Sequence, residues 1–267
     1  MEENIRRLCN IANNIFISES MSNYYKFKYL PQWLNSKGKY FQRERREFEQ
    51  NKNLNFMTFK RSSLVYVDFG VNVGYELSGH HFAIILNKKD NPKNGVLSVI
   101  PISSKQKNNY VPVGSVIEDA AISIIVERAA VTFEKLLTVI HLSAEKKIVN
   151  LDILEKENDF LFELAIKNKM DEQTLRQNEK KYKLYFSDID SLNMHMEKIQ
   201  KEIESYEKIK TIYSKYNKNS FAMANNIQTI SKRRIKRLDN LDLSGELRVP
   251  SYVMEEIDKT IISSFTK

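Results

Sequence analysis

The chain has 267 residues, 42% hydrophobic and 28% charged, which is typical of a globular protein with one large domain or two small ones. Its net charge of +8 favours an anionic partner such as RNA, and its single cysteine, Cys9, excludes an internal disulfide and a cysteine-rich zinc site. No apolar run approaches the roughly 20 residues that a membrane-spanning helix needs, and the N-terminus lacks a signal peptide, so we expect a cytoplasmic protein without membrane contact.

The first twenty residues predict an amphipathic helix that packs on another part of the protein. The apolar residues that recur at steps of three and four are Ile5, Leu8, Ala12, Ile15 and Phe16. From Tyr24 onward, aromatic residues alternate with lysine and arginine, and the only tryptophan, Trp33, follows. Such a mixture can stack on RNA and neutralise it, but an amphipathic packing segment with a solvated face is the more common explanation. This extension could cover a groove, bind a partner or brace the rest of the fold.

Three strands are predicted between residues 61 and 104. Apolar runs at 64–69, 81–86 and 96–102 are separated by segments rich in glycine, asparagine and proline, which are turn formers. Short polar connections favour antiparallel pairing in a small curled sheet. Closing that sheet into a barrel would remove its exposed edges.

This stretch resembles the MazF/PemK-type toxins in the order of VDFG, GYELSG, HHFAIIL and VIPISS. Near the C-terminus, SFAMANNIQTISKRRIKRL is similar to a later strand and helix start of the same family. Members are RNA-cleaving partners in toxin–antitoxin pairs, with a small SH3-like barrel and usually a homodimeric form. They cut single-stranded RNA without a metal and leave a cyclic phosphate and a 5′-hydroxyl. The resemblance therefore implies no cofactor, a single-stranded RNA substrate and an antitoxin protein as partner.

The resemblance also implies a catalytic loop. The family carries Glu, two small residues and Arg-Pro, which fall here on Glu76, the small residues before the strand, His81 and Phe82. The arginine has become histidine, and histidine can act as an acid or a base near neutral pH. The family's Thr-Ser pair falls on Ser103 and Ser104. We therefore expect His81, Glu76 and Ser103 to be catalytic.

RNA cleavage through the 2′-hydroxyl needs a base, an acid for the leaving 5′-oxygen, and donors to the phosphate. Either His80 or His81 could supply one half of the acid–base pair. Neighbours in a strand point to opposite faces, so only one of them should enter the site, and His81 takes the arginine position. The residues expected to bind RNA are His80, Ser104, Lys105, Asn225 and Arg234. Asn225 replaces an acidic residue of many members, and no metal ligands are predicted.

About a hundred residues are inserted before the family's next strand. Residues 116–142 mix strand-like and helical patterns, so their structure stays open. Two rows at seven-residue spacing then predict a long helix, and the first contains Leu175, Tyr182, Ile189, Met196 and Ile203. A shorter apolar row at 151–165 favours an antiparallel helical hairpin that turns near residues 168–172. Pairing with another protomer is the alternative.

The chain is expected to return to the sheet at about residue 220, with a strand at 221–230. Ser231 could cap a helix that begins at KRRIKRL, because its hydroxyl can accept from a free backbone N–H. That basic run contains Arg234, where the family also tends to be basic. Val253, Ile257 and Ile261 predict a final amphipathic helix.

The sequence thus predicts an α+β protein, with a small SH3-like β-barrel, an inserted antiparallel α-helical coiled-coil hairpin and an N-terminal helical extension. The expected domains are an extension at 1–58, a discontinuous barrel at 59–114 and 219–267, and an insertion at 115–218. The expected function is a toxin endoribonuclease. A catalytically inactive module of the same fold that binds RNA or protein, and a coiled-coil interaction protein, are the alternatives.

Overall fold

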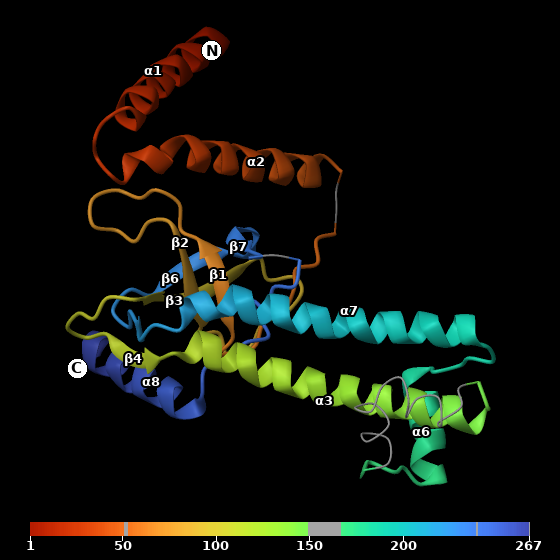
Figure 1. The fold of residues 1–267 in the computed structure, drawn as a ribbon. Coiled ribbons are helices and arrows are strands. Elements are labelled where there is room, and N and C mark those ends of the chain that lie inside the picture. The colour runs from red at the N-terminus through yellow and green to blue at the C-terminus, as the bar shows by residue number, and fades with distance from the viewer. Residues whose placement is uncertain (51–52, 149–166, 239, 267) are drawn as a thin grey trace. The chain divides into compact units, whose positions relative to one another are not determined.

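The computed structural model describes residues 1–50, 53–148, 167–238 and 240–266, and Figure 1 shows its fold. The protein is α+β. It divides into two compact units: unit 1 comprises Met1–Val116 and Lys218–Lys267, and unit 2 comprises Ile117–Asn217. In the described part of the chain, no helix combines the length and the apolar character needed to cross a membrane.

Unit 1 is built on a seven-stranded antiparallel sheet. Its strands are β1 Leu64–Asp68, β2 His80–Ile85, β3 Val96–Ser103, β4 Val111–Gly114, β5 Ser220–Ala222, β6 Gln228–Ser231 and β7 Ile235–Lys236. The strand order is β4-β5-β3-β2-β1-β7, with β6 also paired to β3. This path is open, with β4 and β7 at its two ends among the described strands. The three strands predicted from apolar runs are confirmed, and their buried side chains, including Val65, Val67 and Phe69, form the core.

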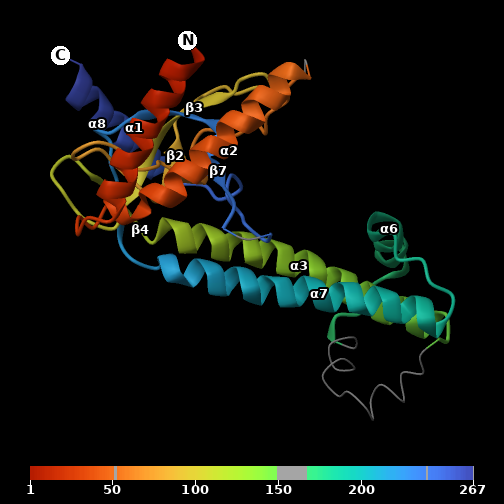
Figure 2. The same cartoon turned by 90° about the horizontal axis from the view of Figure 1, so that it is seen from above.

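In the described residues of unit 1, three α-helices accompany this sheet. They are α1 Glu2–Ser20, α2 Leu30–Glu49 and α8 Ser251–Phe265. The final helix is confirmed, since α8 buries Val253 and Ile257 and contacts β4. The first helix is also confirmed, and α1 contacts α2, yet none of its residues is buried and Ile5 and Leu8 stay exposed. Figures 1 and 2 show α2 lying across the end of the sheet where β1 stops and β2 starts.

The return to the sheet differs from the prediction in two ways. The strand expected at 221–230 is two short strands, because the chain turns after β5 with the Asn226 N–H donating to the Met223 carbonyl at 2.8 Å. Ser231 does cap, accepting from Arg233 N at 3.3 Å, but the helix is a single 3-10 turn, Lys232–Arg234. Ile235 then takes an extended conformation and pairs with β1, which ends the helix.

Unit 2 is helical in its described residues. Its α-helices are α3 Val116–Glu145, α6 Glu172–Tyr182 and α7 Ile189–Tyr213. The segment that sequence left open is thus helical. Figures 1 and 2 both show α3 and α7 running side by side, and the Thr132 hydroxyl donates to the Glu202 carboxylate at 2.8 Å between them. The predicted row at 151–165 lies outside the described residues.

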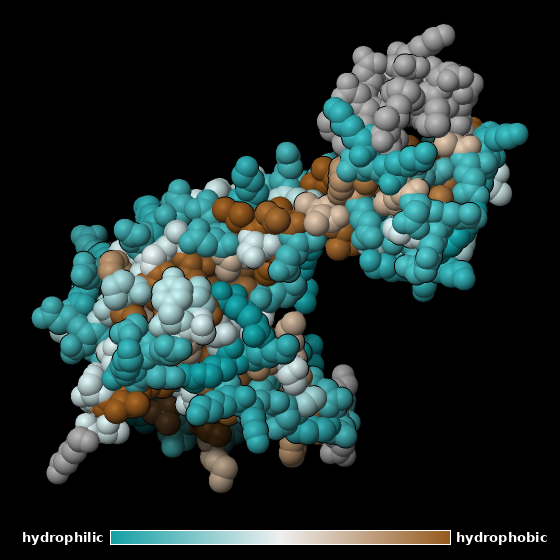
Figure 3. Space-filling model, turned by 90° about the horizontal axis from the view of Figure 1, so that it is seen from below, coloured by the Kyte–Doolittle hydropathy of each residue, from teal (hydrophilic) through white to brown (hydrophobic). Residues whose placement is uncertain are grey.

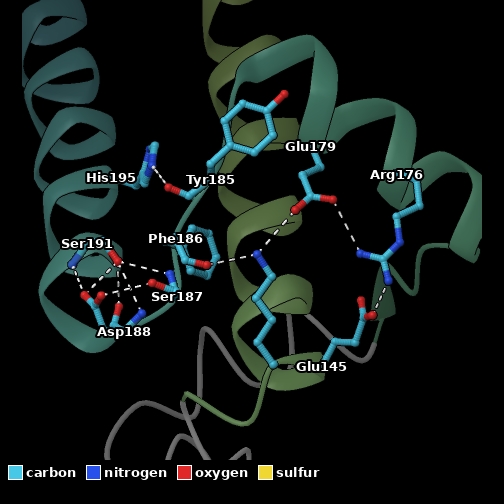
Figure 4. Close-up of polar contacts among 10 residues, drawn as sticks. Glu145, Arg176, Glu179, Tyr185, Phe186, Ser187, Asp188, Ser191 and His195 are labelled. Carbon is cyan, nitrogen blue, oxygen red and sulfur yellow. Dashed lines mark hydrogen bonds and ion pairs between the residues drawn. The ribbon is translucent and has the colours of Figure 1, made fainter.

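The long helix predicted at seven-residue spacing is wrong, because the chain breaks between α6 and α7. Lys183 ends α6 in the left-handed conformation, and Asp188 and Ser191 then form a reciprocal capping box that starts α7. Figure 4 shows this box, with His195 of α7 directed at the Tyr185 carbonyl at 3.3 Å. The same view shows the Glu179 carboxylate of α6 facing Arg176. Lys146, which follows the last residue of α3, forms an ion pair with Glu179 at 3.3 Å.

Candidate functional site

A pocket of about 380 Å³ in unit 1 lies at the end of β1 and the start of β2. β1 ends at Asp68, and β2 begins at His80 after a loop that Gly70 opens in the left-handed region, with φ at 78°. Antiparallel pairing puts Asp68 directly opposite His80. The pocket is lined by Tyr29, Gln32, Trp33 and Ser36 of the N-terminal extension and by Asp68, Gly70, Val71, Gly79, His80 and His81.

Asp68 is the centre of the polar contacts at this pocket. It is buried, and its carboxylate accepts from Gly70 N at 2.9 Å and from the Tyr40 hydroxyl at 3.2 Å. His80 Nε2 lies 3.9 Å from Asp68 Oδ1, and the His80 ring is half exposed to the pocket. Arg234 Nε donates to the Asp68 carbonyl at 2.7 Å, which fixes this arginine beside the same residue. A carboxylate, an imidazole, a phenol and a guanidinium therefore meet at one place.

His81 is held differently. Its Nε2 faces the Ser78 carbonyl at 3.0 Å, and its ring is 6.3 Å from that of Phe69. Burial lowers the pKa of His81, although hydrogen bonds to the Ser78 and Ile102 carbonyls oppose this effect. The ring is therefore neutral at pH 7.

Both histidines line the same pocket, but they differ there: the His80 side chain is half exposed, whereas His81 Nε2 faces the Ser78 carbonyl. Strand alternation separates the faces of a continuous sheet. His80 and His81 are the first two residues of β2, and the expectation that only one of their rings enters the site stays a prediction.

The other expected catalytic residues lie outside this pocket. Glu76 is exposed on the loop, and its carboxylate makes no ion pair within the described ranges. Continuing the register in which Ala83 faces Pro101 puts Ser103 opposite His81. The Ser103 hydroxyl, however, accepts from Lys105 N at 3.0 Å, as at a turn.

The residues expected to bind RNA are scattered. Ser104 and Lys105 are exposed after β3, and Asn225 is exposed in the turn after β5. Only His80 and Arg234 meet, through Asp68. The structure thus brings together His80, His81 and Arg234 of the predicted set, and leaves the rest around the edge of the sheet.

Sequence reasoning missed Asp68, Tyr40 and Trp33. An available signal for Asp68 was a carboxylate inside an apolar strand, since buried carboxylates need partners. Tyr40 and Trp33 carry no such signal, because their role depends on where α2 lies. Burial raises the pKa of the Tyr40 hydroxyl, while Lys236, 4.8 Å from its ring, opposes this effect.

Within the residues that the structure describes, no group of three or more His, Cys, Asp and Glu side chains could hold a metal ion. A scan against protein-family models gives no match for this chain, and a search of the curated proteins gives no significant similarity either.

Proposed function

We propose that the chain is an endoribonuclease that cleaves single-stranded RNA through its own 2′-hydroxyl, as the resemblance to MazF/PemK-type toxins implies. The observation that carries this proposal is the cluster of His80, Asp68 and Arg234 at an open pocket. It offers a proton acceptor, a buried charge that can balance an imidazolium, and a cation for phosphate. The antiparallel sheet, in which β3 pairs with β2, β5 and β6, is the basis for proposing an SH3-like barrel as the scaffold. The pairing of α3 with α7 is compatible with an inserted helical hairpin, although the sequence assigns the first arm to the row at 151–165.

The chemistry assigns the reacting ring to His80. His80 takes the proton from the 2′-hydroxyl, and the new 2′-oxygen–phosphorus bond displaces the 5′-oxygen. Asp68, whose Oδ1 lies 3.9 Å from His80 Nε2, balances the positive charge that forms on the ring. The leaving 5′-oxygen takes a proton from solvent in the open pocket, and the products are a cyclic phosphate and a 5′-hydroxyl.

Arg234 and His81 have supporting roles in this proposal. Arg234 is anchored by its Nε, which leaves its terminal nitrogens for the charge that builds on the phosphate. His81 is neutral and bound to backbone carbonyls, so it positions the start of β2 beside the pocket.

The test is incubation of the purified chain with a mixed single-stranded RNA in EDTA, followed by mapping of product ends. Discrete cuts with cyclic phosphate and 5′-hydroxyl ends are expected. Changing His80→Ala should lower the rate by about 100-fold or more. His81→Gln should lower it less, and Lys259→Ala, an exposed lysine of α8, should not change it.

The resemblance further leads us to propose a cytoplasmic toxin with an antitoxin protein as partner and a homodimeric state. Neither membrane nor metal takes part in this proposal. The molar mass in solution tests the homodimeric state. Co-purification with the co-expressed product of a neighbouring gene tests the antitoxin partner, and both tests are independent of RNA cleavage.

A second candidate is a module of the same fold that binds RNA or protein without cutting it. The contact that favours it is the Tyr40 hydroxyl, which occupies one oxygen of the Asp68 carboxylate. RNA that stays intact but is retained by the protein would support this candidate. Intact RNA without retention would leave a coiled-coil interaction protein, with unit 2 as its working part.

A further inference from the structure

A second pocket in unit 1, of about 450 Å³, adjoins the first one beneath α2. Trp33 and Asp68 line both pockets, so the two are neighbours on either side of these residues. The volume lies in the range of small-molecule sites, which hold about 300 to 1,000 Å³. Its position makes it a natural continuation of the site that contains His80.

Three aromatic rings of α2, those of Trp33, Tyr40 and Phe41, line this pocket. The ammonium group of Lys37 lies 4.8 Å from the centre of the Trp33 ring and 5.9 Å from that of Phe41. These contacts hold the Lys37 charge at the pocket wall, since a cation is attracted to aromatic faces.

The opposite wall comes from the sheet. Val96 at the start of β3 lines the pocket and is about half exposed, although it is a β-branched apolar residue. Arg233 and Arg234 line it from the 3-10 turn. An apolar floor, aromatic rings and fixed cations are the groups that hold a base and its phosphate.

Apart from Arg233, the charged residues at this pocket are Lys37 and Arg234, which are positive, and Glu44 and Asp68, which are negative. Arg233 forms an ion pair with Glu47, and the Asp68 carboxylate accepts from Tyr40 and Gly70 N. Lys37 and the terminal nitrogens of Arg234 can face a phosphate, while the negative charges of Glu44 and Asp68 oppose its binding.

We propose that the pocket beneath α2 binds one nucleotide, with its base against Trp33 and its phosphate between Lys37 and Arg234. The inference rests on the proposed function, because it names the part of the RNA that lies next to the reacting phosphate. It gives the N-terminal extension a role in substrate binding, with Trp33 and Lys37 as residues that contact the ligand.

Trp33 is the only tryptophan in the chain, so its fluorescence reports on this pocket directly. The experiment titrates the full chain carrying His80→Ala with adenosine 3′-monophosphate and with uridine 3′-monophosphate. Excitation at the red edge of tryptophan absorption, with free tryptophan as a reference, removes absorption by the nucleotides. Saturable quenching by either nucleotide is expected. Adenosine and inorganic phosphate, titrated alone, should bind at least about tenfold more weakly.

The variants separate ligand contact from structure. Lys37→Ala should weaken nucleotide binding by about tenfold, because a charge-assisted contact to phosphate is lost. Lys39→Ala is the matched control, since it removes an exposed lysine of the same helix outside this pocket, and should leave the affinity unchanged. Trp33→Ala, followed by calorimetry, should weaken binding by about tenfold or more through lost stacking.

The inference is overturned if no nucleotide quenches Trp33, or if Lys37→Ala and Lys39→Ala bind equally well. Normal RNA cleavage by the Trp33→Ala protein would also overturn it, and would leave the proposed function intact. Quenching that depends on Lys37 in a protein that never cuts RNA would support this site and overturn the proposed function, so the two failures are distinguishable.

Discussion

Lys232 and Asp90 form an ion pair that is almost fully buried, with their charged atoms 2.7 Å apart. Burial raises the pKa of the Asp90 carboxyl, but the hydrogen bonds from Lys232 and from Phe59 N outweigh it and the pKa is lowered. The ion pair therefore contributes to the free energy of unfolding above the Asp90 pKa of the unfolded chain, about 3.8. This contribution is lost as the pH falls through the lower Asp90 pKa of the folded protein. Within the basic run KRRIKRL, Lys232 is thus a buried structural residue.

Changing Asp90→Ala should destabilise unit 1 by about 3 to 5 kcal/mol at pH 7, because it leaves the Lys232 ammonium buried without its partner. The measurement is urea unfolding followed by Trp33 fluorescence. Glu256→Ala is the control, since its pair with Lys259 is exposed and should contribute less than about 0.5 kcal/mol. Equal losses for the two variants would contradict the assignment.

His81 should titrate below its usual pKa of about 6.5, because burial disfavours the charged ring. The chain has four histidines, so NMR of the imidazole protons can follow the titration of each ring. The signal that disappears in the His81→Gln protein belongs to His81. The neutral His81 ring contributes fully to the free energy of unfolding above the pKa of the unfolded state. This contribution is lost as the pH falls through the lower pKa of the folded state. An apparent pKa above 6.5 would place His81 in solvent or beside an anion.

At the level of elements, α2 is joined to the sheet by a close approach between Trp33 and Gly70. A Cβ atom on Gly70 would lie 2.0 Å from Trp33 Nε1, and the φ of Gly70 is 78°. Gly70→Ala should therefore displace Trp33 and shift its emission to the red. Gly74→Ala is the control, because Gly74 also has a positive φ, of 56°, but a Cβ there meets nothing within 4 Å. It should show only backbone strain of about 1 to 2 kcal/mol.

The break between α6 and α7 makes a second prediction about elements. Lys183 ends α6 with φ at 55° and ψ at 46°, a conformation that costs an ordinary residue about 1 kcal/mol relative to glycine. Lys183→Gly should stabilise unit 2 by about that amount in thermal unfolding followed by circular dichroism. Lys180→Gly, inside α6, should destabilise it by about 1 kcal/mol, because glycine is a poor helix former.

Some of these elements could be predicted from the sequence and others could not. β1 to β3 follow from β-branched runs, and α8 from Val253 and Ile257, because burial imposes a period on the residues that face a core. The end of α6 at Lys183 could not be predicted, because a seven-residue apolar spacing does not show that a residue within it takes the left-handed backbone conformation. The site was predicted only in part for a similar reason: Asp68 meets Tyr40 across 28 residues of sequence, and only the placement of α2 brings them together.

At the scale of the whole chain, unit 2 carries apolar side chains at its surface. Figure 3 shows hydrophobic residues among hydrophilic ones on the face that it draws. Ile122, Val126 and Phe133 of α3 and Ile203 of α7 are each more than two fifths exposed. Large exposed apolar surfaces are typical of interaction sites. Self-association through unit 2 and catalysis in unit 1 are thus separable hypotheses.

The connection between the units makes that separation practical. β4 and β5 are neighbouring antiparallel strands, with Gly114 paired to Ser220, so the ends of the insertion meet at one cross-strand pair. Replacing residues 115–219 by Asn-Gly would join β4 and β5 by a two-residue turn of the kind that antiparallel strands favour. Because no strand of the sheet is removed, we expect unit 1 to fold and to keep the emission of Trp33.

The molar mass and the RNA-cutting rate of this shortened protein then decide between the roles of unit 2. An unchanged rate with one copy per particle, where the parent protein has two, would assign assembly to unit 2 and chemistry to unit 1. An unchanged rate with two copies per particle would assign both to unit 1, as expected for a MazF/PemK-like dimer. A folded protein that no longer cuts RNA would contradict the pocket of His80 and Asp68 as a self-sufficient site, because none of its lining residues belongs to unit 2.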